Sequence, residues 1–226
     1  MNFFAHGRRF LDDPYFVAGT AIPDWLNVAD RKVRVRSKHA EPFADSTDPA
    51  EASLARGIKQ HHFDDRWFHE TRAFVELSWR FSSGLREILP EEDGHRRGFV
   101  GHILVELLLD SVLAEDDPQS LEKYYATLEQ VDPQIVEDTV NRMALRSTDR
   151  LASLIKPFLR ERFLWDYSDD AKLGHRLNQV MRRVRLPQLP EAFRDFLSLA
   201  RKEVRERSGE LLTPDAPSPT QADPIA

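Results

Sequence analysis

The feature that most constrains the fold is the segment GHILVELLLDSVLAE, which spans residues 101–115. Leucine, isoleucine and valine occupy most faces of the helix that it predicts, a pattern typical of a central, buried helix. The polar side chains His102, Glu106 and Asp110 are spaced i, i+4 and i+8, so they share one face. Burying a carboxylate is costly unless it is paired or binds a cation. The stripe therefore predicts a cation site, or alternatively it is the solvated side of the helix.

A second stripe with the same spacing precedes it in the sequence. His61, Asp65 and His69 are also spaced i, i+4 and i+8, so two neighbouring helices can present ligands to a shared seam. The intervening His62 and Asp64 fall on other faces, and we expect them at the surface or behind the ligands. The alternative for His61 and Asp65 is an ordinary i, i+4 pair on a helix.

Two residues near the start of the chain extend this set. His6 follows Phe-Phe-Ala, and Asp24 follows Pro23 in AGTAIPDWLN. Taken alone, Asp24 is typical of the first turn of a helix, where a carboxylate complements the helix dipole. Joined to the two stripes, both residues extend the predicted metal ligands to His6, Asp24, His61, Asp65, His69, His102 and Glu106.

The residue types at this site indicate its chemistry. The chain has no cysteine, so a metal must be held by imidazole and carboxylate, a donor set that favours Mn, Fe or Zn over Mg. Such an ion polarises a phosphoryl oxygen and activates water, which predicts hydrolysis of a phosphoester substrate. We predict Asp65 and Asp110 as catalytic carboxylates. Arg182, from the cluster with Arg183 and Arg185, is predicted to hold the phosphate in a bidentate fork.

The rest of the chain predicts an all-α fold, because apolar residues recur at helical spacing from Asp48 to Arg207. Residues 1–210 are expected to form a single helical array, and 211–226 a flexible tail that is too poor in apolar residues to offset its ordering entropy. The stretch 31–49 is expected to be an irregular connection that ends in a helix cap. The expected helices span 8–20, 23–30, 49–69, 71–88, 95–115, 118–129, 132–145, 147–164, 168–185 and 190–208.

Charge and hydropathy restrict the partners. The net charge of −6 disfavours nucleic acid as a partner. We find no signal peptide and no run near the roughly 20 apolar residues of a membrane span, so we expect a cytoplasmic protein that has no membrane partner. The basic segment Arg31–Lys38 is either a solvated surface or a docking site for an acidic partner.

Four segments, taken in order, resemble the acyl carrier protein phosphodiesterase family: MNFFAH, AGTAIPDWLN, GIKQHHFDD and GHILVELLLDSVLAE. The family patterns are an MNFLAH start, GxxxGD, GIxxHRxID and DxxxDHxLA. The resemblance runs over residues 1–130 and more loosely to 185. It implies an all-helical fold distantly similar to HD-domain phosphohydrolases. It also implies a metal-dependent enzyme, typically with Mn, that releases 4′-phosphopantetheine from acyl carrier protein.

The sequence departs from that family pattern at four positions. Glu106 stands where the family has Asp, and Ser111 where it has His. His62 replaces an Arg, and His69 replaces a second Asp. No His-Asp dipeptide occurs, so the chain is not a regular HD domain. By position, the resemblance assigns the family's polar motif to His6, Asp24, His61, Asp65, Glu106 and Asp110.

The order of the predicted ligands is also similar to that in zinc-dependent phospholipase C and the related single-strand nucleases. In those enzymes an N-terminal His is followed by GxxxPD, HxxxD, a further His and HxxxE. They are usually secreted and carry a tryptophan at the mature N-terminus, and this sequence shows neither feature. A third hypothesis is a non-catalytic helical binding protein that keeps the scaffold.

Overall fold

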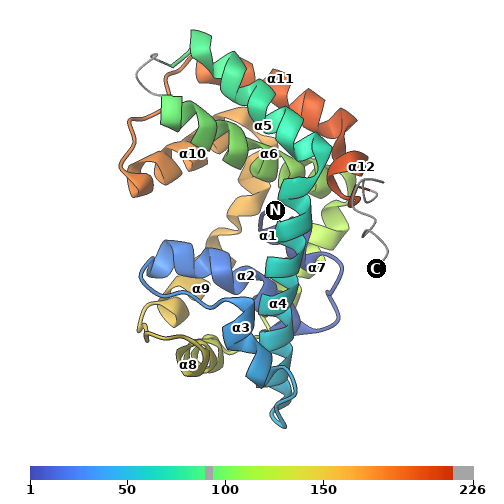
Figure 1. Cartoon of the computed structure of the whole chain (residues 1–226), viewed down its shortest axis with the longest axis vertical. Coiled ribbons are helices and arrows are strands. Elements are labelled where there is room, and N and C mark those ends of the chain that lie inside the picture. Colours follow the sequence, from blue (N-terminus) through green and yellow to red (C-terminus); the bar gives the residue numbers. More distant parts are fainter. Residues whose placement is uncertain (90–93, 216–226) are drawn as a thin grey trace, which may run out of the picture.

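The computed structural model describes residues 1–89 and 94–215 (Figure 1). Within these ranges the chain forms helices and no strand, so the all-α prediction is confirmed. Short 3-10 helices η1 (Glu41–Phe43), η2 (Leu85–Glu87) and η4 (Phe163–Ser168) join the α-helices. The α-helices are α1 (Phe3–Gly7), α2 (Pro14–Ala29), α3 (Ser37–Ala40), α4 (Pro49–Glu70), α5 (Arg72–Gly84), α6 (Gly94–Asp116), α7 (Pro118–Leu128), α8 (Pro133–Met143), α9 (Leu151–Glu161), α10 (Asp170–Val184), α11 (Phe193–Glu206) and α12 (Ser208–Leu211).

An Asp-Pro pair starts four of these helices. Proline occupies the first helical position, where its missing N–H is not needed. The preceding aspartate accepts a hydrogen bond from a backbone N–H of the first turn, which satisfies a donor that has no partner within the helix. This arrangement fixes the starts of α2, α4, α7 and α8, whose capping residues are Asp13, Asp48, Asp117 and Asp132.

Helix α6 is the central helix that the sequence predicts. Leu104, Val105, Leu108 and Leu109 are fully buried, and the helix packs against α5, α11, α1 and η4. Figure 1 shows α5, α6 and α11 together at one end of the molecule and α2, α4 and α9 at the other. The N-terminus lies between these two groups, beside α1 and α4.

Helices α2 and α4 form the most extensive helix contact in the described chain. The contact depends on two glycines. A Cβ atom on Gly57 would lie 2.3 Å from the carbonyl oxygen of Phe16 and 2.8 Å from the Cα of Gly19. Since only glycine permits so close an approach of two backbones, this pair sets the distance between the helices that carry Asp24 and His61.

Two expected boundaries are wrong. The predicted helices 8–20 and 23–30 are one helix, α2, with Pro23 inside it. A proline usually interrupts a helix, but buried residues on both sides of it, including Val17 and Trp25, pack into one core. The predicted helix 147–164 is divided between α9 and η4, because Arg162 adopts a left-handed conformation with φ of 47°.

The connection 31–49 is more ordered than predicted, because it contains α3 and η1. Its cap is confirmed: the side chain of Asp48 accepts hydrogen bonds from the first turn of α4. Val33 and Val35 are buried, while Arg34 and Arg36 alternate with them and are exposed. Burial of the valines therefore holds the basic side chains on the surface.

The described structure extends past the predicted domain end at residue 210. Leu211 is fully buried, and Asp215 accepts a hydrogen bond of 2.7 Å from the backbone N–H of Arg72. Residues 216–226 of the predicted tail lie outside the described residues. None of the described helices combines the length and the apolar character that crossing a membrane requires.

Candidate metal centre

Helices α1, α4 and α6 bring the predicted histidines and carboxylates together in two groups. We call His6, His61 and Asp65 the first triad and His69, His102 and Glu106 the second triad. In each triad, one nitrogen or oxygen atom per residue lies within 4.8 Å of the others, so each can hold a metal ion. The two stripes predicted from the sequence thus converge, and α1 supplies His6 to the first triad.

The first triad is centred on the carboxylate of Asp65. His6 Nε2 lies 3.2 Å from Oδ1, and His61 Nε2 lies 3.3 Å from Oδ2. The two imidazole rings are buried and stack with their centroids 4.1 Å apart. His61 Nδ1 lies 2.8 Å from the carbonyl oxygen of Thr20. Since a carbonyl only accepts, Nδ1 carries a proton, and Nε2 is the ring nitrogen that faces the site.

Asp64 lies behind His6, as the sequence predicts for a residue beside the ligands. Its Oδ2 is 3.5 Å from His6 Nδ1, and its Oδ1 accepts hydrogen bonds from Gln60 (2.9 Å), Trp67 (3.2 Å) and Arg9 (3.3 Å). Burial raises the pKa of Asp64, but His6, Gln60 and Arg9 outweigh it and lower the pKa overall. The resulting carboxylate holds the ring of His6 in place.

The other predicted neighbour, His62, contacts the basic segment. Its Nε2 lies 2.8 Å from the carbonyl oxygen of Val35. Burial lowers the pKa of this imidazole more than that hydrogen bond raises it. His62 therefore supports the connection 31–49 through Val35. Its ring lies edge-on to that of His61.

The second triad is centred on one oxygen atom. His69 Nε2 lies 2.9 Å and His102 Nε2 3.5 Å from Oε1 of Glu106, and both rings contact Phe74. Burial raises the pKa of Glu106, but the Met1 amino group and the two histidines outweigh it, so the pKa lies well below its usual range. This triad is more open than the first, because the side chain of His102 is 47% exposed.

The α-amino group of Met1 joins the two triads. It lies 2.8 Å from Oδ1 of Asp65 and 3.4 Å from Oε1 of Glu106. Burial lowers the pKa of this amine, but Glu106 and Asp65 outweigh the burial and raise it. Met1 was missed in the sequence, because the group is a terminal amine and follows no side-chain pattern.

Asp110, on the same stripe as Glu106, is committed to the backbone. Its Oδ2 accepts from the N–H of Phe4 at 2.9 Å and its Oδ1 from the N–H of Ala5 at 2.7 Å. Burial raises its pKa to about 7, whereas the two N–H donors lower it. Asp110 thus anchors the first turn of α1 and positions His6, and each oxygen of this predicted catalytic carboxylate already accepts a backbone hydrogen bond.

Asp24 differs from Asp110 in that one of its carboxylate oxygens has no partner among the described residues. Its Oδ2 is shielded from solvent and has no hydrogen-bond partner in the described structure. Burial raises its pKa to about 7, against the charge of His61, which lowers it. Asp24 therefore remains available to the site.

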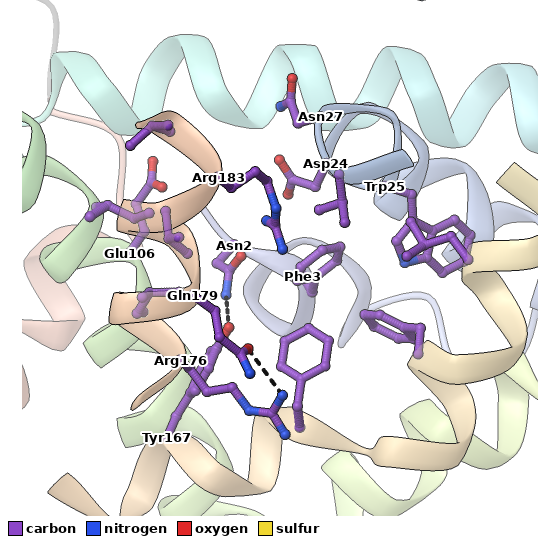
Figure 2. Close-up of a pocket in the computed structure, with 18 of the residues that line it drawn as sticks. Asn2, Phe3, Asp24, Trp25, Asn27, Glu106, Tyr167, Arg176, Gln179 and Arg183 are labelled. Carbon is purple, nitrogen blue, oxygen red and sulfur yellow. Dashed lines mark hydrogen bonds between the residues drawn. The ribbon is translucent and has the colours of Figure 1, made fainter. Parts of the chain in front are cut away.

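A cavity of about 600 Å³ opens beside the second triad (Figure 2). Asp24, His102 and Glu106 lie along its polar part. Arginines from α10 and the basic segment border it: Arg31, Arg34, Arg176 and Arg183. Its apolar wall includes Trp25, Leu154, Pro157, Phe158 and Phe163.

The arginine predicted to bind phosphate lies elsewhere. Arg182 is exposed and does not line the cavity, whereas Arg183, the next residue, does. Consecutive residues on a helix point about 100° apart. The arginine cluster therefore lies on a helix that borders the cavity, but Arg183 and not Arg182 reaches it.

The residues present fit a metal ion. Oδ2 of Asp24 is buried without a hydrogen-bond partner in the described chain, and the two buried ring nitrogens of His6 contact carboxylate oxygens at 3.2 and 3.5 Å without forming a regular hydrogen bond. Such atoms are costly unless something binds them. Imidazole nitrogens and carboxylate oxygens together suit Mn, Fe or Zn.

Comparison of the chain with protein-family models, curated proteins and solved structures finds no match. The case for its function consequently depends on the geometry of the two triads and the cavity.

Proposed function

We propose that this protein is a metal-dependent phosphoester hydrolase. The observation that carries the proposal is the convergence of two His-His-carboxylate triads on the Met1 amine, next to a cavity bordered by arginines. The first triad would hold one divalent cation and the second triad another, with Asp24 available as a further carboxylate. When bound, such cations polarise phosphoryl oxygens and activate water.

The chain's own residues prepare this chemistry. Thr20 and Asp64 orient His61 and His6, so the donors are in place before a ligand arrives. Near the apolar wall of the cavity, electrostatic interactions with the reacting group would be less screened than in bulk water. The arginines supply the positive charge that a phosphoester requires.

The geometry bears on the choice between the two family resemblances. The acyl carrier protein phosphodiesterase pattern includes Asp110, whose oxygens are both held by the backbone of α1. The pattern of zinc-dependent phospholipases C and single-strand nucleases instead includes His69 and His102, which form the second triad with Glu106. This observation favours the second ligand order within the proposed hydrolase class.

An acidic protein partner, such as an acyl carrier protein, is the second part of the proposal. A separate hollow of about 300 Å³ is lined by Lys32, Arg34, Arg36, Lys38, His39, Leu145 and Arg146. None of these Lys and Arg side chains forms an ion pair with a carboxylate in the described ranges, and Arg34 also borders the main cavity. Among the described residues that line the hollow, His39 carries the only aromatic ring, so the hollow offers little surface on which nucleic-acid bases would stack. It suits an acidic surface that presents a tethered phosphoester.

The test is elemental analysis of the purified protein, followed by hydrolysis of an aryl phosphodiester and an aryl phosphomonoester with Mn, Zn or Mg. An affinity tag at the C-terminus leaves the Met1 amine in place. We expect bound transition metal and activity in the wild type, loss of activity and of the metal held by the first triad in His61→Ala, and little change in His62→Ala. A protein without metal and without activity would contradict the proposal and favour the non-catalytic binding protein.

The partner is tested separately. Charge reversal in Lys38→Glu and Arg146→Glu is expected to weaken binding of an acyl carrier protein at low salt, because charge complementarity mainly governs association. Hydrolysis of the small aryl ester should stay unchanged, since neither residue borders the main cavity. Unchanged affinity would remove this surface as the docking site.

A further inference from the structure

The arginines that border the main cavity differ in how they are held. Arg176 is fixed by Asp166 at 2.7 Å and by Glu161 at 3.4 Å. Arg34 donates to the side-chain oxygen of Asn27. Arg31 and Arg183 have no ion pair and no side-chain hydrogen bond to any described residue. Two of the cavity arginines are thus committed to the protein, and two are available to a ligand.

Arg183 lines the same cavity as the carboxylates of Asp24 and Glu106. Figure 2 shows its side chain running from α10 toward Asp24 and Asn2. Burial and the neighbouring charge of Arg31 lower the pKa of Arg183, which nevertheless stays cationic at neutral pH. Two guanidinium groups close together without a counter-ion repel each other, and a bound anion removes that cost.

From this placement we propose that Arg31 and Arg183 form the anion subsite that holds the phosphoryl group of the substrate, with Arg183 as its principal contact. The identity of the anion rests on the proposed hydrolase function. Arg183 presents planar, forked donors that match two phosphate oxygens. The subsite would hold the phosphoryl group between α10 and the side of the cavity that carries Asp24 and Glu106.

The helix provides a matched control. Arg182 carries the same side chain one position earlier and is exposed, as Arg183 is, but it does not line the cavity. Removing either arginine makes the net charge more negative by the same amount, so a difference between the two variants reports position and not charge. Arg183→Lys keeps the charge but loses the fork, and it separates bidentate binding from simple attraction.

The experiment measures binding of inorganic phosphate by calorimetry to the metal-free and metal-loaded full chain, and hydrolysis of the aryl phosphodiester in parallel. We expect Arg183→Ala to weaken phosphate binding by about 10- to 100-fold, the range for a lost hydrogen-bonded charge. Arg31→Ala and Arg183→Lys should have smaller effects, and Arg182→Ala should bind as the wild type does. Metal content and thermal stability should be unchanged in Arg183→Ala.

The outcomes separate this inference from the proposed function. Hydrolysis by the wild type with phosphate binding unaffected in Arg183→Ala would overturn the subsite and leave the hydrolase intact. Phosphate binding that depends on Arg183, in a protein with no hydrolytic activity, would support the subsite and remove the hydrolase. Equal losses in Arg182→Ala and Arg183→Ala, or no phosphate binding by the wild type, would also overturn the subsite.

Discussion

The contact between Gly57 and Gly19 allows a sharp test of how the fold positions the site. Gly57→Ala adds a single Cβ atom 2.3 Å from the carbonyl oxygen of Phe16, whereas real Cβ contacts essentially never fall below 3.0 Å. The obstacle is backbone, so no side chain can rotate away. Helices α2 and α4 must therefore separate by about 0.7 Å or more at this point.

The free energy follows from two opposing effects. Overpacking of a tight contact typically costs about 1–3 kcal/mol, while replacing glycine by alanine in a helix favours folding by up to about 1 kcal/mol. The cost should lie near the upper end of its range because the obstacle is backbone, and we expect a net loss of about 2 kcal/mol. For a chain of this size this corresponds to a fall in Tm of about 4–8 °C.

The separation of α2 and α4 also displaces His61 in the first triad. His61 lies one helical turn after Gly57, and its Nδ1 is held by Thr20, the residue after Gly19. Because misplacement by about 1 Å can cost about 100-fold in rate, kcat/KM should fall by more than the loss of folded protein explains. The assays are urea denaturation, metal titration and hydrolysis of the aryl phosphodiester.

Gly98→Ala is the control, because nothing lies within 4 Å of a Cβ atom at that position in α6. It should leave stability unchanged or raise it by up to about 1 kcal/mol. A Gly57→Ala protein as stable as Gly98→Ala, with normal metal affinity, would refute the reasoning that the glycine pair sets the position of His61.

Three further predictions concern the groups around the site. Asp110→Ala leaves the N–H groups of Phe4 and Ala5 without their acceptor. Urea denaturation should therefore show a loss of about 2–5 kcal/mol in the free energy of unfolding, and a smaller loss in Asp110→Asn. An unchanged denaturation midpoint would show that α1 is anchored elsewhere. In the metal-free protein, Asp24 has a folded-state pKa of about 7, raised from 3.8 by burial. It keeps a proton that the unfolded chain has lost, so its contribution to stability is full below pH 3.8 and declines as the pH rises to about 7. Thermal denaturation across that window should show a shallower decline in Asp24→Asn, and parallel curves would contradict the assignment. A metal ion at about 100 times its Kd should stabilise the wild type by about 2.7 kcal/mol, or about 5–10 °C in Tm. His61→Ala should lose most of this shift, and an equal shift in both proteins would place the ion outside the first triad.

Local patterns in the sequence predicted much of the fold and several residues of the site. Helical spacing and Asp-Pro caps are set within a few residues, so the starts of α4, α7 and α8 could be predicted closely. The i, i+4, i+8 stripes placed His61 with Asp65 and His102 with Glu106 by helix geometry alone. Pro23 misled the prediction, because its local effect is overridden by packing on both sides of it.

The sequence by itself determined that this protein is helical and that two of its helices each carry a line of histidines and carboxylates. Only the tertiary structure decided which lines meet, that Asp110 anchors α1, that Met1 joins the triads and that Arg183 borders the cavity in place of Arg182. The physical reason is that periodicity fixes the face of one helix relative to its own axis. The rotation and separation of neighbouring helices depend on packing between residues far apart in the chain, such as Gly19 and Gly57.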